Sequence, residues 1–397
     1  MTVTVIGAGI TGITTAYYLA RSGYDVLVVD QERYSGMGTS YANGGQLSAS
    51  NSEVWNSWHN VAKGAKWMFR KDAPLKINPA PSLHKYSWFA KFLSHIPNRK
   101  ENTHHTCEMA IEAHDLYKNI AEREGIDFDC VKQGIMHIYS NEKDLQSARL
   151  TNKIYRSAGL ARNEITSEEV FSIEPELQNS RRSIVGGFYT EEDFTGDIHK
   201  FCTNLARCLE RHYAVQFVQE TVDKDSLELF QKQGPVVICA GTGSRDIAKL
   251  IGDNLPIYPV KGYSITVNEP GNSPWTSLLD DETKIVSSRL GESRFRAAGT
   301  AEFNGYNRDI LQHRVQPLVD WTEELFPQMN TESVVPWAGL RPMTPNMMPI
   351  VKQSKKNSNI WYNTGHGHLG WTLSAYTAID IANKILHNDG NKQHKYI

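Results

Sequence analysis

Three glycines near the start of the chain have the spacing Gly-x-Gly-x-x-Gly, at Gly7, Gly9 and Gly12. A β-branched run over residues 3–6 comes before them, and a segment with helical apolar spacing follows over residues 13–22. In a strand–turn–helix unit the first glycine permits a tight turn, the second lets the backbone approach a pyrophosphate, and the third allows close packing of helix on strand. The helix N-terminus then presents free N–H groups to the diphosphate. The segment therefore predicts a dinucleotide site.

The next buried strand, residues 26–29, ends in an acidic residue, Asp30. An acid at this point of a βαβ unit is placed to accept hydrogen bonds from the ribose hydroxyls of the adenosine. Gly23 is a suitable stop for the helix between the two strands. We expect the residues around both turns to contact the dinucleotide, namely Ile6, Gly7, Gly9, Ile10, Thr11, Gly12, Asp30 and Gln31.

Two further glycine-containing segments are able to bring the backbone close to a ligand. The loop at residues 39–48 is small and polar, so it can pass along phosphates and lie against a flat ring. Ala240 and Gly241 end a buried strand that begins at Val236, and a glycine there permits close approach to a nucleotide. An ordinary surface turn would explain the first segment taken alone, and a plain strand–helix turn would explain the second.

Residues 363–372 form a glycine-rich turn that opens a helix. If the dinucleotide contains a flavin, the N–H groups of this turn could face its electron-rich atoms and stabilise the negative charge that develops on reduction. His366 and His368 lie two residues apart in this turn without an acidic cluster beside them, so we predict no metal site. Arg341 has apolar and proline neighbours, and a rigidly held guanidinium is the natural bidentate partner of a carboxylate. A structural salt bridge is the alternative for Arg341.

The composition is that of a globular protein. The 397 residues are 40% hydrophobic and 22% charged, and 42 basic against 44 acidic residues give a net charge of −2. Such a balance argues against a nucleic-acid binder, which needs a basic face. Five cysteines without a CxxC pair argue against a disulfide framework or a zinc site. Residues 1–20 are uncharged, but glycines interrupt them and no basic segment precedes them, so a strand and turn explain them better than a signal peptide. No stretch is long enough for a membrane span.

The order of the predicted elements indicates how these segments meet. We expect helices over residues 104–125, 142–158, 199–211 and 370–387, and strands over residues 134–139, 215–218, 236–241 and 359–363. Strands alternate with helices, which is typical of an α/β nucleotide-binding domain. We expect this domain in three pieces, with a second domain inserted in two. The predicted pieces are 1–75, 190–256 and 333–397 for the first, and 76–189 and 257–332 for the second.

Six segments, in order along nearly the whole chain, resemble the D-amino acid oxidase (DAO) superfamily of FAD enzymes, and within it the bacterial D-amino acid dehydrogenases. The segments are residues 39–48 (Thr-Ser-x-Ala-Asn-Gly-Gly-Gln-Leu-Ser), 66–69, 195–197, 258–264, 339–345 (Gly-Leu-Arg-Pro-Met-Thr-Pro) and 363–372. The resemblance implies an α/β fold: a Rossmann-like FAD-binding domain of the GR2/DAO type with an inserted α+β substrate domain.

The resemblance also implies roles for single residues. Arg341 would bind the substrate carboxylate, while Tyr263 and His366 are further candidates for the catalytic site; a packed strand tyrosine is the alternative for Tyr263. The segments expected to contact FAD beyond the first turn supply Ser40, Asn43, Gly44, Gly45, Gln46, Leu47, Ala240, Gly241, Gly339, Arg341, Gly365, His366, Gly367, Leu369, Gly370 and Thr372. No cysteine follows Cys239, so we expect non-covalent FAD. Asn346 stands where the family usually has an acid, which puts fine specificity in doubt.

The implied reaction is oxidative deamination of D-amino acids to 2-oxo acids and ammonia, with hydride transfer from Cα to flavin N5. Electrons would pass to a quinone or another non-oxygen acceptor. Residues 63–97 combine lysines with Trp67, Met68, Phe69, Trp88, Phe89, Phe92 and Leu93. They are interpreted either as a face that touches a membrane or as a packed helix. The expected location is cytoplasmic, with a peripheral contact on the inner face of the cell membrane.

Three alternatives stay open on the sequence. The first is a secondary amino acid as substrate, such as D-proline, a hydroxy-D-proline or an N-substituted glycine. The second is a nicotinamide-linked dehydrogenase, against which residues 39–48 and the Gly-His-Gly turn argue. The third is a non-catalytic flavoprotein subunit, in which a carboxylate clamp at Arg341 would have no purpose.

Overall fold

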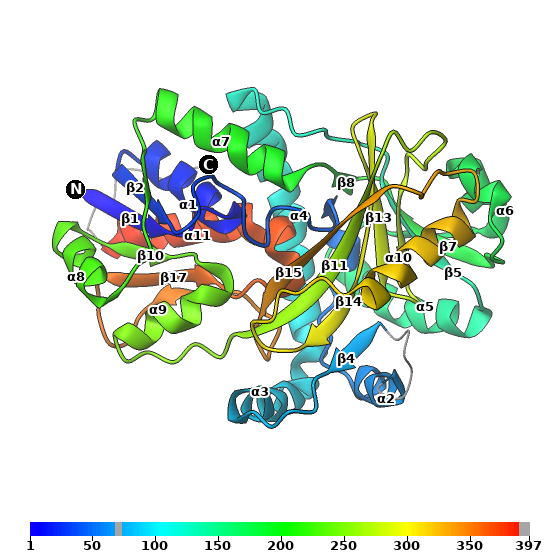
Figure 1. Ribbon diagram of the computed structural model, residues 1–397, viewed down its shortest axis with the longest axis horizontal. Coiled ribbons are helices and arrows are strands. Elements are labelled where there is room, and N and C mark those ends of the chain that lie inside the picture. Colours follow the sequence, from blue (N-terminus) through cyan, green and yellow to red (C-terminus); the bar gives the residue numbers. More distant parts are fainter. Residues whose placement is uncertain (68–73, 389–397) are drawn as a thin grey trace.

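The computed structural model describes residues 1–67 and 74–388, and two large β-sheets form its framework (Figure 1). The first sheet has the order β16–β17–β10–β1–β2–β9, with all pairs parallel except β16–β17. Its strands are β1 (Thr2–Ile6), β2 (Asp25–Asp30), β9 (Gln216–Gln219), β10 (Val236–Ile238), β16 (Ile350–Gln353) and β17 (Ile360–Thr364). The predicted strands at residues 215–218 and 359–363 are thereby confirmed within one residue at either end, whereas the strand predicted over residues 236–241 ends at Ile238.

Helices cover both faces of the first sheet because its buried strands are apolar on both sides. Val237 packs into one hydrophobic cluster, whereas Val236 and Ile238 pack into another. The first cluster is shared by α1 (Ile10–Arg21), α4 (Arg99–Glu124), α7 (Ile198–His212) and α11 (Gly370–Asn388). The second is shared by α8 (Lys224–Gln233) and α9 (Ser244–Leu250).

The second sheet has the order β15–β11–β14–β13–β12–β5–β7–β6, and β4 pairs with β14. Helix α10 (Gln312–Leu325) packs on it in a separate hydrophobic cluster. The strands are β4 (Leu75–Ile77), β5 (Ile135–Tyr139), β6 (Asn163–Thr166), β7 (Gly186–Thr190), β11 (Tyr258–Asn268), β12 (Ser277–Asp280), β13 (Ile285–Leu290), β14 (Arg294–Phe303) and β15 (Val334–Met343). The strands β3 (Gln46–Leu47) and β8 (Phe194–Thr195) form a short antiparallel pair, and β3 lies near the end of the loop at residues 39–48. The remaining helices are α2 (Trp58–Trp67), α3 (Leu83–Ser94), α5 (Glu142–Ser157) and α6 (Ser167–Ile173).

Two elements, β15 and α4, pack against the other part of the molecule from the one that the predicted domain boundaries assign to them. The predicted boundary at residue 333 puts β15 in the nucleotide-binding piece, yet β15 pairs with β11 in the second sheet. Helix α4 belongs to the predicted inserted piece, yet Ala113 and Tyr117 pack in the cluster that covers the first sheet. Strand pairing and helix packing over long sequence separations decide both placements, and neither leaves a local signal in the sequence.

Among the described aromatic residues of segment 63–97, Trp88, Phe89 and Phe92 pack inward, as a packed helix predicts, whereas Tyr86 is exposed. Trp88 is buried and donates a hydrogen bond from Nε1 to the Met343 carbonyl oxygen at 2.8 Å. Phe89 and Phe92 pack against the same hydrophobic cluster. Met68 and Phe69 lie outside the described residues. None of the helices within residues 1–67 and 74–388 is long and apolar enough to cross a bilayer.

Candidate functional site

The carboxyl ends of parallel strands in the first sheet meet at one edge, which brings the predicted turns together. β1 leads to Gly7, β10 to Ala240 and β17 to Gly365. A cavity of about 1240 Å³ lies along this edge and reaches Arg341 on β15. Small-molecule sites usually occupy about 300–1000 Å³. The cavity therefore has room for a dinucleotide together with a second, smaller ligand.

The three glycines of the first turn have different structural roles: two permit close packing and one leaves space beside the helix N-terminus. Gly7 has φ +110°, and a Cβ there would lie 2.7 Å from the Cys239 carbonyl oxygen. A Cβ at Gly12 would lie 1.7 Å from the Gly7 carbonyl oxygen. A Cβ at Gly9 would have only Ser40 Oγ nearby, at 3.4 Å, and Gly9 caps α1 without a side-chain hydrogen bond. Gly7 and Gly12 thus permit the packing of β10, β1 and α1, while Gly9 keeps the α1 N-terminus open to the cavity.

Asp30 lies at the end of β2 and lines the cavity. Its Oδ2 accepts a hydrogen bond from the Ala8 N–H at 2.5 Å, and its Oδ1 accepts one from the Glu32 N–H at 2.8 Å. Burial raises the pKa of Asp30, and these N–H donors oppose that shift. The carboxylate is therefore fixed beside the glycine turn, where a ribose would follow the diphosphate.

The loop at residues 39–48 is fastened to both sheets. Ser40 Oγ accepts a hydrogen bond from the Ile10 N–H at 3.1 Å, which joins the loop to the first turn of α1. Thr39 Oγ1 donates to the Leu340 carbonyl oxygen at 2.7 Å on β15. Ser264 Oγ, on β11, donates to the Ala42 carbonyl oxygen at 2.8 Å. The loop is consequently held against the cavity from either side.

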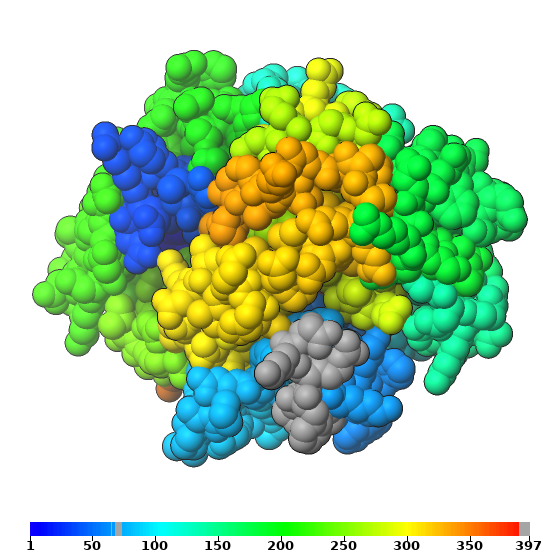
Figure 2. Space-filling model, turned by 45° about the vertical axis from the view of Figure 1, so that its right-hand side comes forward, coloured from blue at the N-terminus to red at the C-terminus, as the bar shows by residue number. Residues whose placement is uncertain are grey.

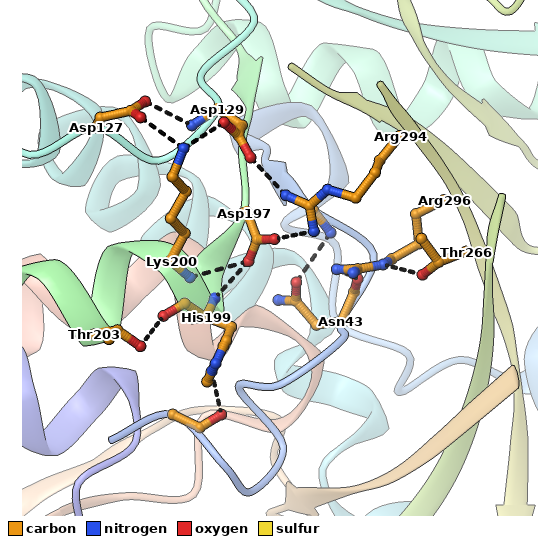
Figure 3. A network of polar contacts seen from close by, with 12 residues as sticks. Asn43, Asp127, Asp129, Asp197, His199, Lys200, Thr203, Thr266, Arg294 and Arg296 are labelled. Carbon is orange, nitrogen blue, oxygen red and sulfur yellow. Dashed lines mark hydrogen bonds and ion pairs between the residues drawn. The ribbon is translucent and has the colours of Figure 1, made fainter. Parts of the chain in front are cut away.

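A network of charged side chains joins the same loop to β14 and α7 (Figure 3). Arg296 donates from NH1 to the Asn43 carbonyl oxygen at 3.3 Å. Arg294 forms ion pairs with Asp129 at 2.5 Å and with Asp197 at 2.7 Å. Although burial opposes ionisation of Asp197, Arg296, backbone N–H groups and Arg294 outweigh it and hold the pKa of that carboxyl below its usual range. Asp197 also caps α7, so the network links the loop, β14 and a helix of the first sheet.

The two histidines of the C-terminal turn have different surroundings. His366 is buried, its Nε2 lies 2.8 Å from Thr377 Oγ1, and burial lowers its pKa to about 3. His368 stacks on Trp55 with ring centroids 4.7 Å apart. Burial and the nearby charge of Arg341 lower the pKa of His368 to about 3. Both imidazoles are therefore neutral at neutral pH.

Arg341 presents a guanidinium to the cavity. Its NH1 donates to the Thr300 carbonyl oxygen at 2.7 Å. Burial lowers its pKa to about 10, so it stays cationic at neutral pH. Among the described residues no carboxylate forms an ion pair with it, so the structural salt bridge considered above is not formed there. A cation in this position is free to bind an anionic ligand.

Tyr263 is oriented differently from Arg341. Its hydroxyl donates to Glu302 Oε2 at 3.0 Å and is also 3.3 Å from the Asp309 carbonyl oxygen. Its ring packs with α10 in the hydrophobic cluster of the second sheet. Its partner on β15 is Ala338, whose side chain lies on the opposite face of the strand from that of Arg341. Tyr263 borders the cavity, but this packing favours the structural role that the sequence left open.

Most of the predicted contact residues line the cavity, with instructive exceptions. Gly12, Gly45 and Leu47 are not part of the lining, and Leu47 is completely buried in the core. Gln46 lines the cavity, but its amide donates to Ser277 Oγ and the Leu278 carbonyl oxygen. Asn346 lies outside the lining and accepts a hydrogen bond from the Met348 N–H at 3.2 Å, so it shapes its own turn rather than the carboxylate site. The predicted residues in the lining are Ile6, Gly7, Gly9, Ile10, Thr11, Asp30, Gln31, Ser40, Asn43, Gly44, Gln46, Ala240, Gly241, Tyr263, Gly339, Arg341, Gly365, His366, Gly367, Leu369, Gly370 and Thr372.

Three further residues belong to the site although the sequence did not single them out as contacts. Thr300 holds Arg341, Trp55 stacks on His368, and His368 itself was considered only as a metal ligand. His368 had a signal, because it lies inside the turn predicted to cover the flavin. No sequence motif indicated Thr300 or Trp55, because only the tertiary packing brings them to the cavity.

Known proteins resemble this chain over nearly its full length. The model of the family described as "DAO: FAD dependent oxidoreductase" matches residues 2–384. "D-amino acid dehydrogenase 3" of Mesorhizobium japonicum is 51% identical over 402 residues, which cover 96% of each chain. Glycine oxidase from Bacillus cereus has a similar fold, with a TM-score of 0.72 at 18% identity, covering 98% of this chain and 95% of that one. L-α-Glycerophosphate oxidase from Mycoplasma pneumoniae with FAD bound gives a TM-score of 0.70 at 17% identity, covering 98% of this chain and 95% of that one.

The residues of the cavity fit FAD. The open face of Gly9 and the N-terminus of α1 suit a diphosphate, and Asp30 lies where a ribose would follow. Residues of the loop at 39–48 and of the turn from Gly365 to Thr372 line the same cavity, as does Arg341. The cofactor would thus bind along the edge of the first sheet and leave the guanidinium for a second ligand.

Proposed function

The chain belongs to the DAO family of FAD-dependent oxidoreductases, and we propose that it oxidises D-amino acids to 2-oxo acids and ammonia. The observation that carries this proposal is the cationic Arg341, which lines the cavity and has no carboxylate partner among the described residues. A guanidinium in this position suits an α-carboxylate, which it can bind through two parallel hydrogen bonds. The name of the Mesorhizobium japonicum relative supports the choice of D-amino acids.

In this proposal the protein binds and orients the substrate. FAD, when bound, supplies the acceptor for the hydride that leaves Cα, at flavin N5. Arg341 holds the substrate carboxylate, so that the Cα–H bond is directed at the cofactor rather than sampled in free encounters. His366 and His368, both neutral, line the same end of the cavity without adding charge. The imine product then leaves and is hydrolysed to the 2-oxo acid and ammonia.

Ammonia release separates the proposed substrates from secondary amino acids. With an artificial dye as acceptor and oxygen excluded, we expect equal amounts of ammonia, 2-oxo acid and reduced dye from a primary D-amino acid. Oxidation of D-proline or a hydroxy-D-proline gives a cyclic imine and no ammonia. Dye reduction by these cyclic substrates alone would contradict the proposal and favour the secondary-amine alternative. Failure of every amino acid to reduce the dye would leave the non-catalytic flavoprotein.

We further propose that the electrons pass to a quinone or another non-oxygen acceptor at the inner face of the cell membrane. The surface of α2 and α3 that exposes Trp58, Leu83, Tyr86 and Leu93, here called the α2–α3 face, supports this proposal. Leu83 is 90% exposed and Trp58 67%, and both helices lie at the same edge of the molecule in Figures 1 and 2. Trp67 and Leu93 also border the cavity, so this face is close to a route inward.

Co-sedimentation with vesicles tests the membrane contact. The wild-type protein should sediment with vesicles that contain anionic lipid, and replacing Trp58 and Leu83 by serine should abolish sedimentation. A double replacement of Leu150 and Leu229 by serine is the matched control, since both are exposed leucines on other helices. Equal sedimentation of all three proteins, or of none, would remove the membrane contact from the proposal.

We propose that FAD is held without a covalent bond. Cys239, the cysteine that lines the cavity, has a fully buried thiol whose pKa burial raises to about 12, so it stays protonated and a poor nucleophile. Acid precipitation of the purified protein should leave the flavin in the supernatant. Flavin that remains in the pellet after denaturation would contradict non-covalent binding.

A further inference from the structure

An irregularity in the second sheet lies beside Arg341. On β11 a single residue, Gly262, separates Lys261 from Tyr263, whereas their partners Glu302 and Gly299 on β14 are separated by Thr300 and Ala301. Two residues opposite one is the definition of a β-bulge, and bulges are common next to active sites. The Ala301 N–H leaves the β11 ladder and donates to the Pro74 carbonyl oxygen at 2.7 Å.

Thr300 has a backbone conformation that a β-branched residue seldom adopts. Its φ is +63°, in the left-handed region that favours glycine and disfavours a branched side chain. Its hydroxyl oxygen is buried without a hydrogen-bond partner among the described residues. The side chain therefore does not explain the conformation. The carbonyl group of Thr300 accepts a hydrogen bond from Arg341 NH1 at 2.7 Å.

Gly262 lies on β11, the strand between β15 with Arg341 and β14 with Thr300. Arg341 lies on β15 opposite Val260 of β11, and it reaches Thr300 on β14 by crossing β11. A Cβ at Gly262 would lie 2.3 Å from Arg341 NH2, so only a glycine leaves room for the guanidinium at this point. The three strands thus contribute the cation, the space and the acceptor, and all three residues line the cavity.

We propose that the β-bulge at Thr300 is a positioning device, in which the Thr300 carbonyl aims the Arg341 guanidinium at the substrate carboxylate. This inference rests on the proposed function, because it needs Arg341 as the carboxylate clamp. Thr300 takes one of the five guanidinium N–H donors and leaves the others for the ligand. The strained backbone is held by the pairing of β14 with β11 and by the bond from Ala301 to Pro74.

Proline and glycine at position 300 distinguish the role of the backbone from that of the side chain. Proline fixes φ near −65° and is incompatible with the bulge, so Thr300→Pro should turn the carbonyl away. Glycine adopts positive φ freely, so Thr300→Gly should keep it. We expect Thr300→Pro to weaken binding of propionate, a carboxylate without an amine, by about 10- to 100-fold, the range for a lost hydrogen bond to a charged group. Thr300→Gly should stay within about 3-fold of wild type, with an unchanged or higher Tm.

The measurement is a titration of the FAD-loaded protein with propionate, followed by the flavin absorbance. Ala214→Pro is the matched control, because Ala214 also has positive φ, at 53°, but is not part of the cavity lining. It should lower the Tm without changing the Kd for propionate. If Thr300→Pro does not load with FAD, deletion of Thr300, which removes the extra residue of the bulge, is measured in the same way. Unchanged propionate affinity in either variant would overturn the inference.

A double-mutant cycle decides whether Thr300 acts through Arg341. With Arg341→Ala in place, Thr300→Pro should cause no further loss of propionate affinity, because there is no guanidinium left to aim. Additive losses would mean that Thr300 acts in another way and would overturn the inference. If Arg341→Ala itself leaves propionate binding unchanged, the clamp and with it the proposed function fail, which is a different result from a failure of Thr300→Pro alone.

Discussion

The two ends of the cavity are built by different means. The nucleotide end uses backbone: Gly7 and Gly12 let β10, β1 and α1 pack together, and Gly9 keeps the N–H groups of α1 accessible. The substrate end uses one charged side chain, Arg341, whose position depends on Gly262 and Thr300 of two other strands. A site made of consecutive backbone groups can be recognised in a short motif, whereas a site made by three strands is visible only after folding.

The largest expected effect is at the substrate end. Arg341→Ala should reduce kcat/KM for a D-amino acid by about 3–5 kcal/mol of transition-state binding, the cost of removing one partner of a buried charge pair. FAD content should be unchanged, because the replacement leaves the glycine turn and Asp30 in place. Steady-state kinetics with an artificial dye provide the measurement. A variant within 2-fold of wild type would show that no carboxylate binds at Arg341.

A methyl group at Gly262 should damage the same end without removing any charge. The new Cβ in Gly262→Ala would lie 2.3 Å from Arg341 NH2, so the guanidinium must move away from Thr300. We expect a loss of about 2–3 kcal/mol in kcat/KM, close to the value of a hydrogen bond to a charged group. Gly23→Ala, which meets no atom within 4 Å but has φ +84°, is a control for backbone strain alone. Equal losses in the two variants would contradict the role of Gly262.

Acidification should distinguish the histidine turn from the nucleotide end. Burial lowers the pKa of His366 to about 3, so the unfolded chain binds a proton between about pH 6.5 and 3 that the folded chain does not, and stability falls as the pH falls. From pH 6.5 to 5 the expected loss is about 2 kcal/mol for this residue, at 1.36 kcal/mol per pKa unit. Burial raises the pKa of Asp30, so the contribution of Asp30 to stability rises as the pH falls. Thermal unfolding of His366→Gln should show a weaker acid dependence than wild type; an identical dependence would refute this assignment.

The smallest effect is expected at Asp30. Asp30→Ala removes the acceptor for the Ala8 N–H and for the ribose hydroxyls, so FAD should bind about 1–3 kcal/mol more weakly. Asp30→Asn keeps one acceptor oxygen and should lose less. The kcat of the FAD-saturated protein should stay near that of wild type, because the nucleotide end does not touch the substrate. Reconstitution of the apoprotein with FAD measures both quantities, and a kcat that falls in parallel with FAD affinity would contradict the separation of the two ends.

The strand, glycine turn and helix of the nucleotide end could be predicted because each of them is local, whereas their contacts with a dinucleotide stay a prediction. Strand β1, the glycine turn, α1 and Asp30 follow one another within thirty residues, and their spacing carries the argument. The strands at residues 215–218 and 359–363 were also predictable from short runs rich in apolar residues, and for residues 236–241 the start but not the end of the strand was correct. Arg341 was predicted from its rigid apolar neighbours, but its partner Thr300 could not be, because a bulge depends on register between strands that are far apart in sequence.

Three features that the sequence left open or placed elsewhere have the same origin. Tyr263 lies in the sequence next to a cavity-lining glycine, yet strand alternation turns its hydroxyl to Glu302. Trp88 belongs to an aromatic-rich segment, yet tertiary packing buries it. β15 follows the inserted domain in sequence, yet hydrogen bonding joins it to that domain. Side-chain direction and strand partners are tertiary properties, so composition and short motifs do not determine them.

The central claim is that this protein passes electrons from D-amino acids to its bound FAD. The most direct test is to mix the purified holoenzyme with pooled D-amino acids in the absence of oxygen, and separately with pooled L-amino acids, and to follow the flavin absorbance. The account predicts bleaching by the D pool and none by the L pool. Flavin that stays oxidised with both pools, or that is bleached by the L pool alone, would contradict it.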